Sequence, residues 1–183
     1  MKCIECGDQE IEKIDQEGKE KYRCSKGHVN ERVIDNQGLE YYRECGDLVH
    51  RTVGVIVKHR DEILLLKRRK YPYSYTIPAG HLEQEEDPDK AVKRELKEET
   101  GVEAGGEEFN QVFRGRIEDP CRRGCDIHDW NLYIYRPEQK PSTKTNDEAE
   151  KTEWVQTEDI SRKELTRPTE KFLVEKDLIS DME

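Results

Sequence analysis

Large apolar side chains are scarce in this sequence. Only 32% of its 183 residues are hydrophobic whereas 40% are charged, and it holds just 3 phenylalanines and 2 tryptophans. We therefore expect a lean hydrophobic core in one domain of ordinary size, or in one domain with a small appendage. No apolar run approaches the roughly 18 residues that a transmembrane helix needs, so we expect no membrane-spanning segment.

The sequence also lacks an excess of positive charge. Its formal net charge of -10 argues against broad attraction to nucleic acid or to anionic membranes. A local basic patch is not excluded by this balance, so nucleic acid stays an open but disfavoured partner. The N-terminus, MKCIECGDQE, has no apolar segment after its lysine and does not resemble a secretory signal. We predict a cytoplasmic protein whose cysteines are free or metal-bound rather than disulfide-paired.

Two regions of different character meet near residue 36. Residues 1–37 hold three of the 6 cysteines and short charged runs that form at most brief strands, with too few large apolar residues for a core. The turn-forming residues Asp-Asn-Gln-Gly at 35–38 mark the boundary. Residues 38–183 mix strand and helix patterns, which predicts an α/β layered domain.

The strands and helices of the second region are predicted from its apolar patterns. Residues 52–59 and 63–69 are β-rich and flank the polar turn Arg-Asp-Glu, which predicts a hairpin. Further strands are predicted at residues 109–117, 130–136 and 152–156. Helices are predicted at residues 157–164 and 169–182, the second with Thr169 as its N-cap.

An acidic segment lies between these strands, with the sequence GHLEQEEDPDKAVKRELKEETGV at residues 80–102. Asp87 can cap a helix and Pro88 suits its first position, so we expect the helix to begin there. Gly101 is expected to end it.

Three glutamates of this predicted helix share one of its faces. Glu95, Glu98 and Glu99 lie within about a third of a turn, on a side that also holds Ala91 and Val92. Carboxylates this close repel each other, and partial burial strengthens the repulsion. A divalent cation with hard oxygen ligands, Mg²⁺ or Mn²⁺, resolves the conflict. The alternative is a solvated acidic face held by pairs spaced four residues apart.

The same segment resembles a complete Nudix box. The fixed positions of that motif are occupied here by Gly80, Glu86, Arg94, Glu95, Leu96, Glu98, Glu99, Gly101 and Val102. The resemblance implies an α/β/α sandwich with a mixed sheet, and metal-dependent hydrolysis of a nucleoside diphosphate linked to another moiety. It also implies that Glu95, Glu98 and Glu99 bind the catalytic Mg²⁺ or Mn²⁺. Arg94 would pair with Glu86 and brace the loop before the helix.

Two further features are candidate parts of the site. Glu148, in NDEAEKTEWV, resembles the acidic loop from which some family members take a general base. The base can also lie in the box, and a solvated acidic loop is the alternative for Glu148. Arg68 and Arg69, in the run KRRK before the box, are candidates to bind substrate phosphates. An ordinary basic strand end is the alternative for this run.

The N-terminal cysteines have the spacing of a zinc site. Cys3 and Cys6 form Cys-x2-Cys, and Cys24 and His28 form Cys-x3-His, a set that suits tetrahedral Zn²⁺. A short region without a hydrophobic core also needs another source of stability, such as a bound metal ion. The region resembles a zinc ribbon, although the usual second pair there is Cys-x2-Cys. The fourth ligand therefore stays open between His28 and Cys45, and free surface thiols are the alternative to zinc.

Cys121, Cys125 and His128, in CRRGCDIHD, have spacings that permit a second metal site. A mobile loop with free thiols is the favoured alternative for this segment.

We therefore expect a Mg²⁺-dependent nucleotide or nucleotide-sugar pyrophosphohydrolase with a small-molecule nucleotide substrate and a structural Zn²⁺. One alternative is a weakly active Nudix fold that senses a nucleotide or binds nucleic acid or a partner protein. Another is an RNA-end pyrophosphohydrolase. The intact carboxylate set favours catalysis. Zinc ribbons precede Nudix domains in the NADH pyrophosphatase branch, but that branch's extra motif is not found here, so the substrate stays open. The oligomeric state stays open as well.

Overall fold

A mixed eight-stranded sheet forms the centre of the structure, a computed structural model that describes residues 1–104 and 109–179. Its strands are β6 (Tyr41–Glu44), β7 (Asp47–His59), β8 (Glu62–Arg68), β9 (Tyr75–Thr76), β10 (Ala79–His81), β11 (Asn110–Glu118), β12 (Ile127–Tyr135) and β13 (Ala149–Gln156). The main order is β11-β12-β7-β8-β13, with β6 and β10 also paired to β7 and β9 paired to β8. Strand β12 runs parallel to β7, whereas the neighbouring pairs are antiparallel.

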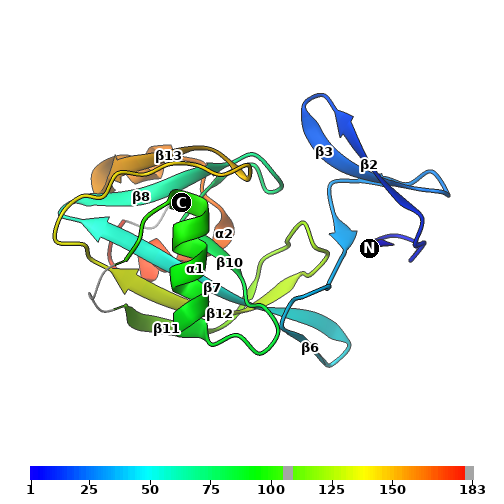
Figure 1. Ribbon diagram of the computed structural model, residues 1–183, viewed down its shortest axis with the longest axis horizontal. Helices are drawn as coiled ribbons and strands as arrows, with labels where there is room; N and C mark the ends of the chain where they lie inside the picture. Colours follow the sequence, from blue (N-terminus) through cyan, green and yellow to red (C-terminus); the bar gives the residue numbers. More distant parts are fainter. Residues whose placement is uncertain (105–108, 180–183) are drawn as a thin grey trace.

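Strand β7 carries the core on both of its faces, because alternate side chains point to opposite sides of a sheet. Val55 packs in a buried cluster with Leu96 of helix α1 (Pro88–Thr100). Its neighbour Ile56 packs on the other face with Phe172 of helix α2 (Arg167–Glu175). Burying one such side chain contributes about 1.5–3 kcal/mol. The sheet therefore lies between α1 and α2, and the predicted α/β/α sandwich is confirmed (Figure 1).

Helix α1 begins and ends where the sequence predicts. The Asp87 carboxylate accepts a hydrogen bond from the Asp89 amide at 2.9 Å, and Pro88 occupies the first turn. Gly101, with φ of 69°, closes the helix through its amide, which donates to the Lys97 carbonyl. These caps fix the position of the glutamates on the helix.

The predicted start of the last helix is wrong. Thr166, not Thr169, is the N-cap of α2, because Pro168 is well suited to a first turn. Thr169 instead forms a buried hydroxyl contact of 2.8 Å with Thr166. Helix α2 ends at Glu175, earlier than predicted, and the final three residues of that prediction lie outside the described residues. The segment predicted as helix at 157–164 forms a 3-10 helix, η1 (Thr157–Arg162).

Residues 2–34 form two small sheets. One pairs β1 (Lys2–Cys3) with β5 (Val33–Ile34), and the other has the order β2 (Ile11–Gln16), β3 (Lys19–Cys24) and β4 (Val29–Asn30). This N-terminal module lies at one end of the molecule, beside the loop between β11 and β12 (Figure 1). The boundary predicted after residue 37 falls between β5 and β6.

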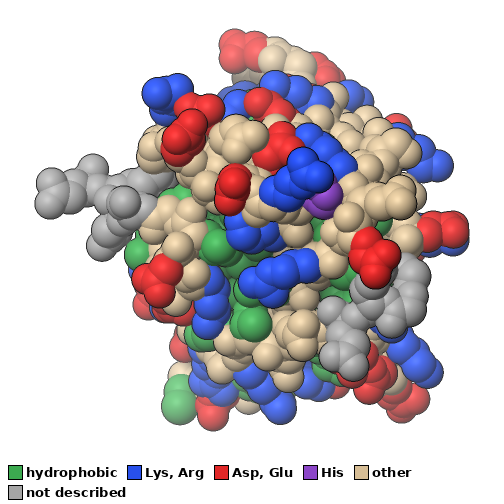
Figure 2. Space-filling model, turned by 90° about the vertical axis from the view of Figure 1, so that its left-hand side faces the viewer, with side chains coloured by type: hydrophobic (Ala, Val, Ile, Leu, Met, Phe, Trp, Pro, Cys, Tyr) green, Lys and Arg blue, Asp and Glu red, His purple; other side chains and the backbone are tan. Residues whose placement is uncertain are grey.

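Charged side chains dominate the opposite end of the molecule. Acidic and basic groups are interspersed there, and apolar side chains appear in small areas between them (Figure 2). Among the described residues, 1–104 and 109–179, no helix has both the length and the apolar composition to cross a membrane.

Candidate active site

A cleft of about 360 Å³ opens beside α1, and charged groups of both signs line it. Its carboxylates are Glu83, Glu95, Glu98, Glu99, Asp119 and Glu148, and its guanidinium groups are those of Arg68, Arg94, Arg122 and Arg123. Grouped carboxylates suit a hard cation, and arginines suit phosphate oxygens. The lining therefore offers both halves of a metal–phosphate site.

Two glutamates of α1 lie in the wall of the cleft, Glu99 buried and Glu95 partly buried. Glu99 is 6% exposed, and its Oε2 accepts a hydrogen bond of 2.8 Å from the Ala79 amide. Burial, and after it the charge of Glu95, raises the pKa of Glu99 to about 8. Burial also raises the pKa of Glu95 to about 7, although Arg94 opposes that rise. Negative charge at this pair is costly without a cation, so the donor set fits Mg²⁺ or Mn²⁺.

Gly80 allows Glu95 to approach the backbone of β10. A Cβ atom at Gly80 would lie 2.0 Å from the Glu95 carboxyl carbon, which is an impossible contact. The glycine of the box is therefore required by the position of a carboxylate.

Arg94 ties the loop before α1 to these carboxylates. Its Nε and Nη2 donate to the two oxygens of Glu86 at 2.9 and 2.7 Å. Its Nη1 donates to Glu95 at 2.7 Å and to Glu98 at 3.2 Å. A further hydrogen bond of 3.2 Å runs from Nη2 to the His81 carbonyl. The Arg94 hydrogen bond also lowers the pKa of Glu86, which keeps this brace charged.

Three further arginines line the cleft, of which the sequence indicated one. Arg68 lines the cleft, and its buried Nε has no hydrogen-bond partner in the described part of the chain. Arg69 is exposed and does not line the cleft, so of the predicted pair only Arg68 faces it. Arg122 and Arg123 also line the cleft. Their role was not predicted, because only the cysteines and the histidine of that segment suggested a site.

Glu148 lies at the mouth of the cleft, with its side chain 46% exposed. Its carboxylate is 3.1 Å from Lys70 Nζ and 4.0 Å from Arg122 Nη2. Partial burial acts to raise the pKa of Glu148, but Lys70 and the nearby arginines more than offset it and lower the pKa. Glu148 is therefore ionised at neutral pH and able to accept a proton.

The N-terminal module brings together the predicted zinc ligands. The ligand atoms of Cys3, Cys6, Cys24 and His28 all lie within 4.8 Å of one another. Cys6 Sγ is 3.9 Å from Cys24 Sγ, which in turn is 3.5 Å from His28 Nδ1. Cys45 lies in the exposed turn between β6 and β7 and does not join this group. The geometry thus groups His28, rather than Cys45, with the three cysteines.

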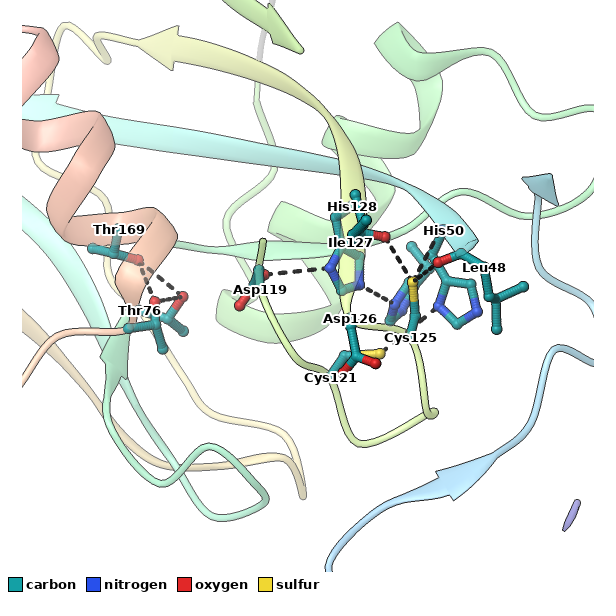
Figure 3. Close-up of polar contacts among 12 residues, drawn as sticks. Leu48, His50, Thr76, Asp119, Cys121, Cys125, Asp126, Ile127, His128 and Thr169 are labelled. Atoms are coloured by element: carbon teal, nitrogen blue, oxygen red, sulfur yellow. Dashed lines mark hydrogen bonds and ion pairs between the residues drawn. The ribbon is translucent and has the colours of Figure 1, made fainter. Parts of the chain in front are cut away.

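A second cluster of metal-ligand side chains lies at the cleft, and its members are His50, His81, Cys121 and His128. Figure 3 shows His50, Cys121 and His128 of this cluster. Burial lowers the pKa of His50 to about 4 and that of His128 to about 3, so both imidazoles are uncharged at neutral pH. Cys125, predicted as a candidate ligand, is not in the cluster. Its thiol instead donates to the carbonyls of Leu48 and Ile127, at 3.0 and 2.7 Å. His50 and His81 were missed because they lie far from Cys121 in the sequence.

The sequence of this chain is similar to parts of known proteins. Mouse diphosphoinositol polyphosphate phosphohydrolase 3-alpha is 44% identical over 71 residues, which are 39% of this chain and 39% of the mouse protein. The ADP-ribose pyrophosphatase of Methanocaldococcus jannaschii is 32% identical over 95 residues, covering 50% of this chain and 54% of that protein. The matched segment thus spans about two fifths to one half of these relatives.

Structural comparison agrees with the sequence. The NUDIX domain of Shewanella oneidensis NrtR, solved in complex with ADP ribose, superposes with a TM-score of 0.60 at 15% identity. That match covers 74% of this chain and 88% of the other, and it shows a common fold. The sequence pattern of the family described as NUDIX domain matches residues 48–175, which are most of the chain. The predicted resemblance is confirmed, and the chain belongs to the Nudix hydrolase family.

Proposed function

We propose that this protein is a Mg²⁺- or Mn²⁺-dependent hydrolase that cleaves the diphosphate linkage of a nucleotide or nucleotide sugar. The observation that carries the proposal is the carboxylate wall of the cleft. Arg94 joins Glu86 to Glu95 and Glu98, while Glu99 is buried beside them against Ala79. A fold that only senses a nucleotide has no need to keep Glu95, Glu98 and Glu99 together.

The cation would be held by Glu95, Glu98 and Glu99. When bound, it supplies positive charge that stabilises the negative charge developing on the diphosphate. The burial of Glu99 and the hydrogen bonds from Arg94 to Glu95 and Glu98 support this role, because metal ligands need rigid partners that orient them.

The other residues of the cleft would bind the substrate and receive a proton. Arg68, Arg122 and Arg123 line the cleft and carry guanidinium groups that match phosphate oxygens. Glu148, ionised beside Lys70, is the proposed proton acceptor from the attacking water. A carboxylate of the box is the competing candidate for that proton.

The size of the cleft and its arginines support two candidate classes of substrate. A cleft of about 360 Å³ is at the lower end of small-ligand sites, which suits a nucleoside diphosphate derivative such as ADP-ribose. A diphosphoinositol polyphosphate is the second candidate. The three arginines favour a densely phosphorylated ligand. Mouse diphosphoinositol polyphosphate phosphohydrolase 3-alpha, which is 44% identical over its matched segment, is named for such a substrate.

A substrate panel tests this proposal. Purified full-length protein with Mg²⁺ would be assayed for phosphate and nucleotide release from ADP-ribose, a dinucleoside polyphosphate, a nucleoside triphosphate, a diphosphoinositol polyphosphate and 5′-triphosphorylated RNA. We expect metal-dependent cleavage of one nucleotide diphosphate class. Tight binding without cleavage of any compound would contradict the enzyme and favour the sensing protein.

We also propose that residues 1–37 form a separate module held by Zn²⁺, with Cys3, Cys6, Cys24 and His28 as its ligands. This module buries few apolar side chains, so its small sheets need a bound metal ion for stability. The cytoplasmic location stays a prediction.

A further inference from the structure

Three neighbouring strands place three histidines on one face of the sheet. His128 of β12 lies directly beside His50 of β7 in the parallel register. His81 of β10 lies opposite Thr52, two residues along β7 from His50. Because residues two apart in a strand share a face, the three imidazoles point to the same side. Cys121, from the loop between β11 and β12, completes the cluster.

The distances in this cluster suit a single tetrahedral ion. His81 Nε2 and His128 Nε2 are 3.3 Å apart, and Cys121 Sγ is 3.8 Å from His50 Nδ1. All four ligand atoms lie within 4.8 Å of one another. Around tetrahedral zinc, with its usual bond lengths to nitrogen and sulfur, ligand atoms are separated by about 3.3–3.8 Å. Little movement would therefore bring the four atoms into coordination.

The outer nitrogens of two imidazoles already have the surroundings that metal ligands need. His50 Nε2 is 2.9 Å from the Asn36 side-chain oxygen, which leaves Nδ1 free to face Cys121. His128 is 2% exposed, and its Nδ1 lies 3.6 Å from the Asp119 carboxylate (Figure 3). That separation is too long for a hydrogen bond. Histidine ligands usually give their second N–H to such a carboxylate or carbonyl, and a bound ion would fix this tautomer.

We propose that His50, His81, Cys121 and His128 bind a Zn²⁺ ion, separate both from the catalytic cations and from the ion of the N-terminal module. Three imidazoles and one thiolate are ligands that zinc prefers over Mg²⁺. Four protein ligands close the coordination shell, which is typical of a structural ion. Cys121 would release its proton to solvent as the ion binds.

The ion would fasten the loop at residues 119–126 to the sheet. Arg122 and Arg123 follow Cys121 directly in this loop and line the cleft. The same loop contacts the N-terminal module, since the Val33 amide donates to the Arg122 carbonyl at 2.9 Å. The zinc site would thus hold two substrate-facing arginines in place and support the docking of the module.

Zinc analysis of the full-length protein gives the first test. We expect about two Zn²⁺ per chain in the wild type and about one in Cys121→Ser. The neighbouring Cys125→Ser variant is the matched control, because its hydroxyl can keep the hydrogen bonds of the thiol, and it should retain both ions. Equal zinc content in Cys121→Ser and the wild type would overturn the proposal.

One spectroscopic and one chemical measurement keep the proposal testable if Cys121→Ser folds poorly. In a full-length variant with Cys3, Cys6 and Cys24 replaced by Ser, Co²⁺ should still give thiolate charge-transfer absorption, which the carboxylate site cannot produce. Absence of that absorption would contradict the site. In the wild type, Zn²⁺ should protect Cys121 from alkylation, as read by peptide mass spectrometry. Equal alkylation with and without zinc would also refute it.

Discussion

Arg94 uses one guanidinium group to hold three glutamates and a backbone carbonyl. Its side chain is 24% exposed, and its paired hydrogen bonds to Glu86 are short and parallel. Glu86 and Glu95 are 15% and 14% exposed, so these contacts form a partly buried network rather than an exposed ion pair. The guanidinium group therefore fixes the positions of Glu95 and Glu98 relative to the loop before the helix.

Arg94→Ala should weaken the metal site without unfolding the protein. We expect lower activity and a Mg²⁺ requirement raised by about 10–100-fold, because the orienting partner of the ligands is lost. The melting temperature should change only modestly. The measurement is activity across a Mg²⁺ titration, with the exposed Lys90→Ala of the same helix as the control. A titration of Arg94→Ala that overlays the wild type would mean that the acidic helix is only a solvated surface.

The pH dependence of stability should reveal the buried charge of Glu99. Without Mg²⁺, the folded protein holds the Glu99 proton up to about pH 8, whereas the unfolded chain loses it near the ordinary value of 4.5. Between these values the folded state binds more protons, so stability falls as the pH rises. Thermal unfolding in Mg²⁺-free buffer should show the wild type losing stability relative to Glu99→Gln from about pH 5 to about pH 8. A constant difference between the two proteins would contradict the buried, proton-holding Glu99.

The loop between β11 and β12 links the cleft to the N-terminal module. Arg32 donates from its guanidinium to the carbonyls of Cys121 and Cys125, at 2.9 and 3.0 Å. Gly124 has φ of 82°, and a Cβ atom there would lie 2.9 Å from the Ile34 Cα of β5. The glycine therefore permits both the turn of the loop and its close contact with the module.

Gly124→Ala should loosen this contact. A positive φ costs a non-glycine residue about 1–2 kcal/mol, and Gly38→Ala isolates that cost because φ is 75° there and no atom lies within 4 Å. The clash with Ile34 should add about 1–3 kcal/mol to the loss in Gly124→Ala. Chemical denaturation of the two variants measures the difference. Equal destabilisation would show that the loop and the module are not in close contact.

Local signals in the sequence predict some of these elements and not others. Asp87, Pro88 and Gly101 define helix α1 because caps act within one turn. The N-cap of α2 was misplaced because threonines lie on both sides of Pro168, at positions 166 and 169. Only the folded structure shows that Thr166 is the cap and that Thr169 is buried. The histidine cluster depends on the register of β12 and β10 against β7. That register arises from contacts between segments far apart in the chain.

At the scale of the whole molecule, the chain combines a Nudix domain with a small module that has few apolar residues of its own. The strand and helix patterns predicted an α/β layered domain, and the resemblance of the box to the Nudix motif implied the sandwich. The two arginines of the β11–β12 loop could not be assigned to the cleft, because only the folded sheet brings that loop to the cleft. The loop carries Cys121 of the proposed second zinc site and contacts the module through Arg32, so the module and the cleft are expected to depend on each other.

The measurement that tests the central claim most directly is the turnover of Glu99→Gln on a diphosphate substrate identified in the panel. The account predicts that turnover with Mg²⁺ falls about 100-fold or more, while the fold is kept, because a buried ligand charge is removed. Glu103→Gln, an exposed glutamate paired with Lys97 just beyond the helix, should stay close to the wild type. Turnover of Glu99→Gln equal to that of the wild type would contradict the account.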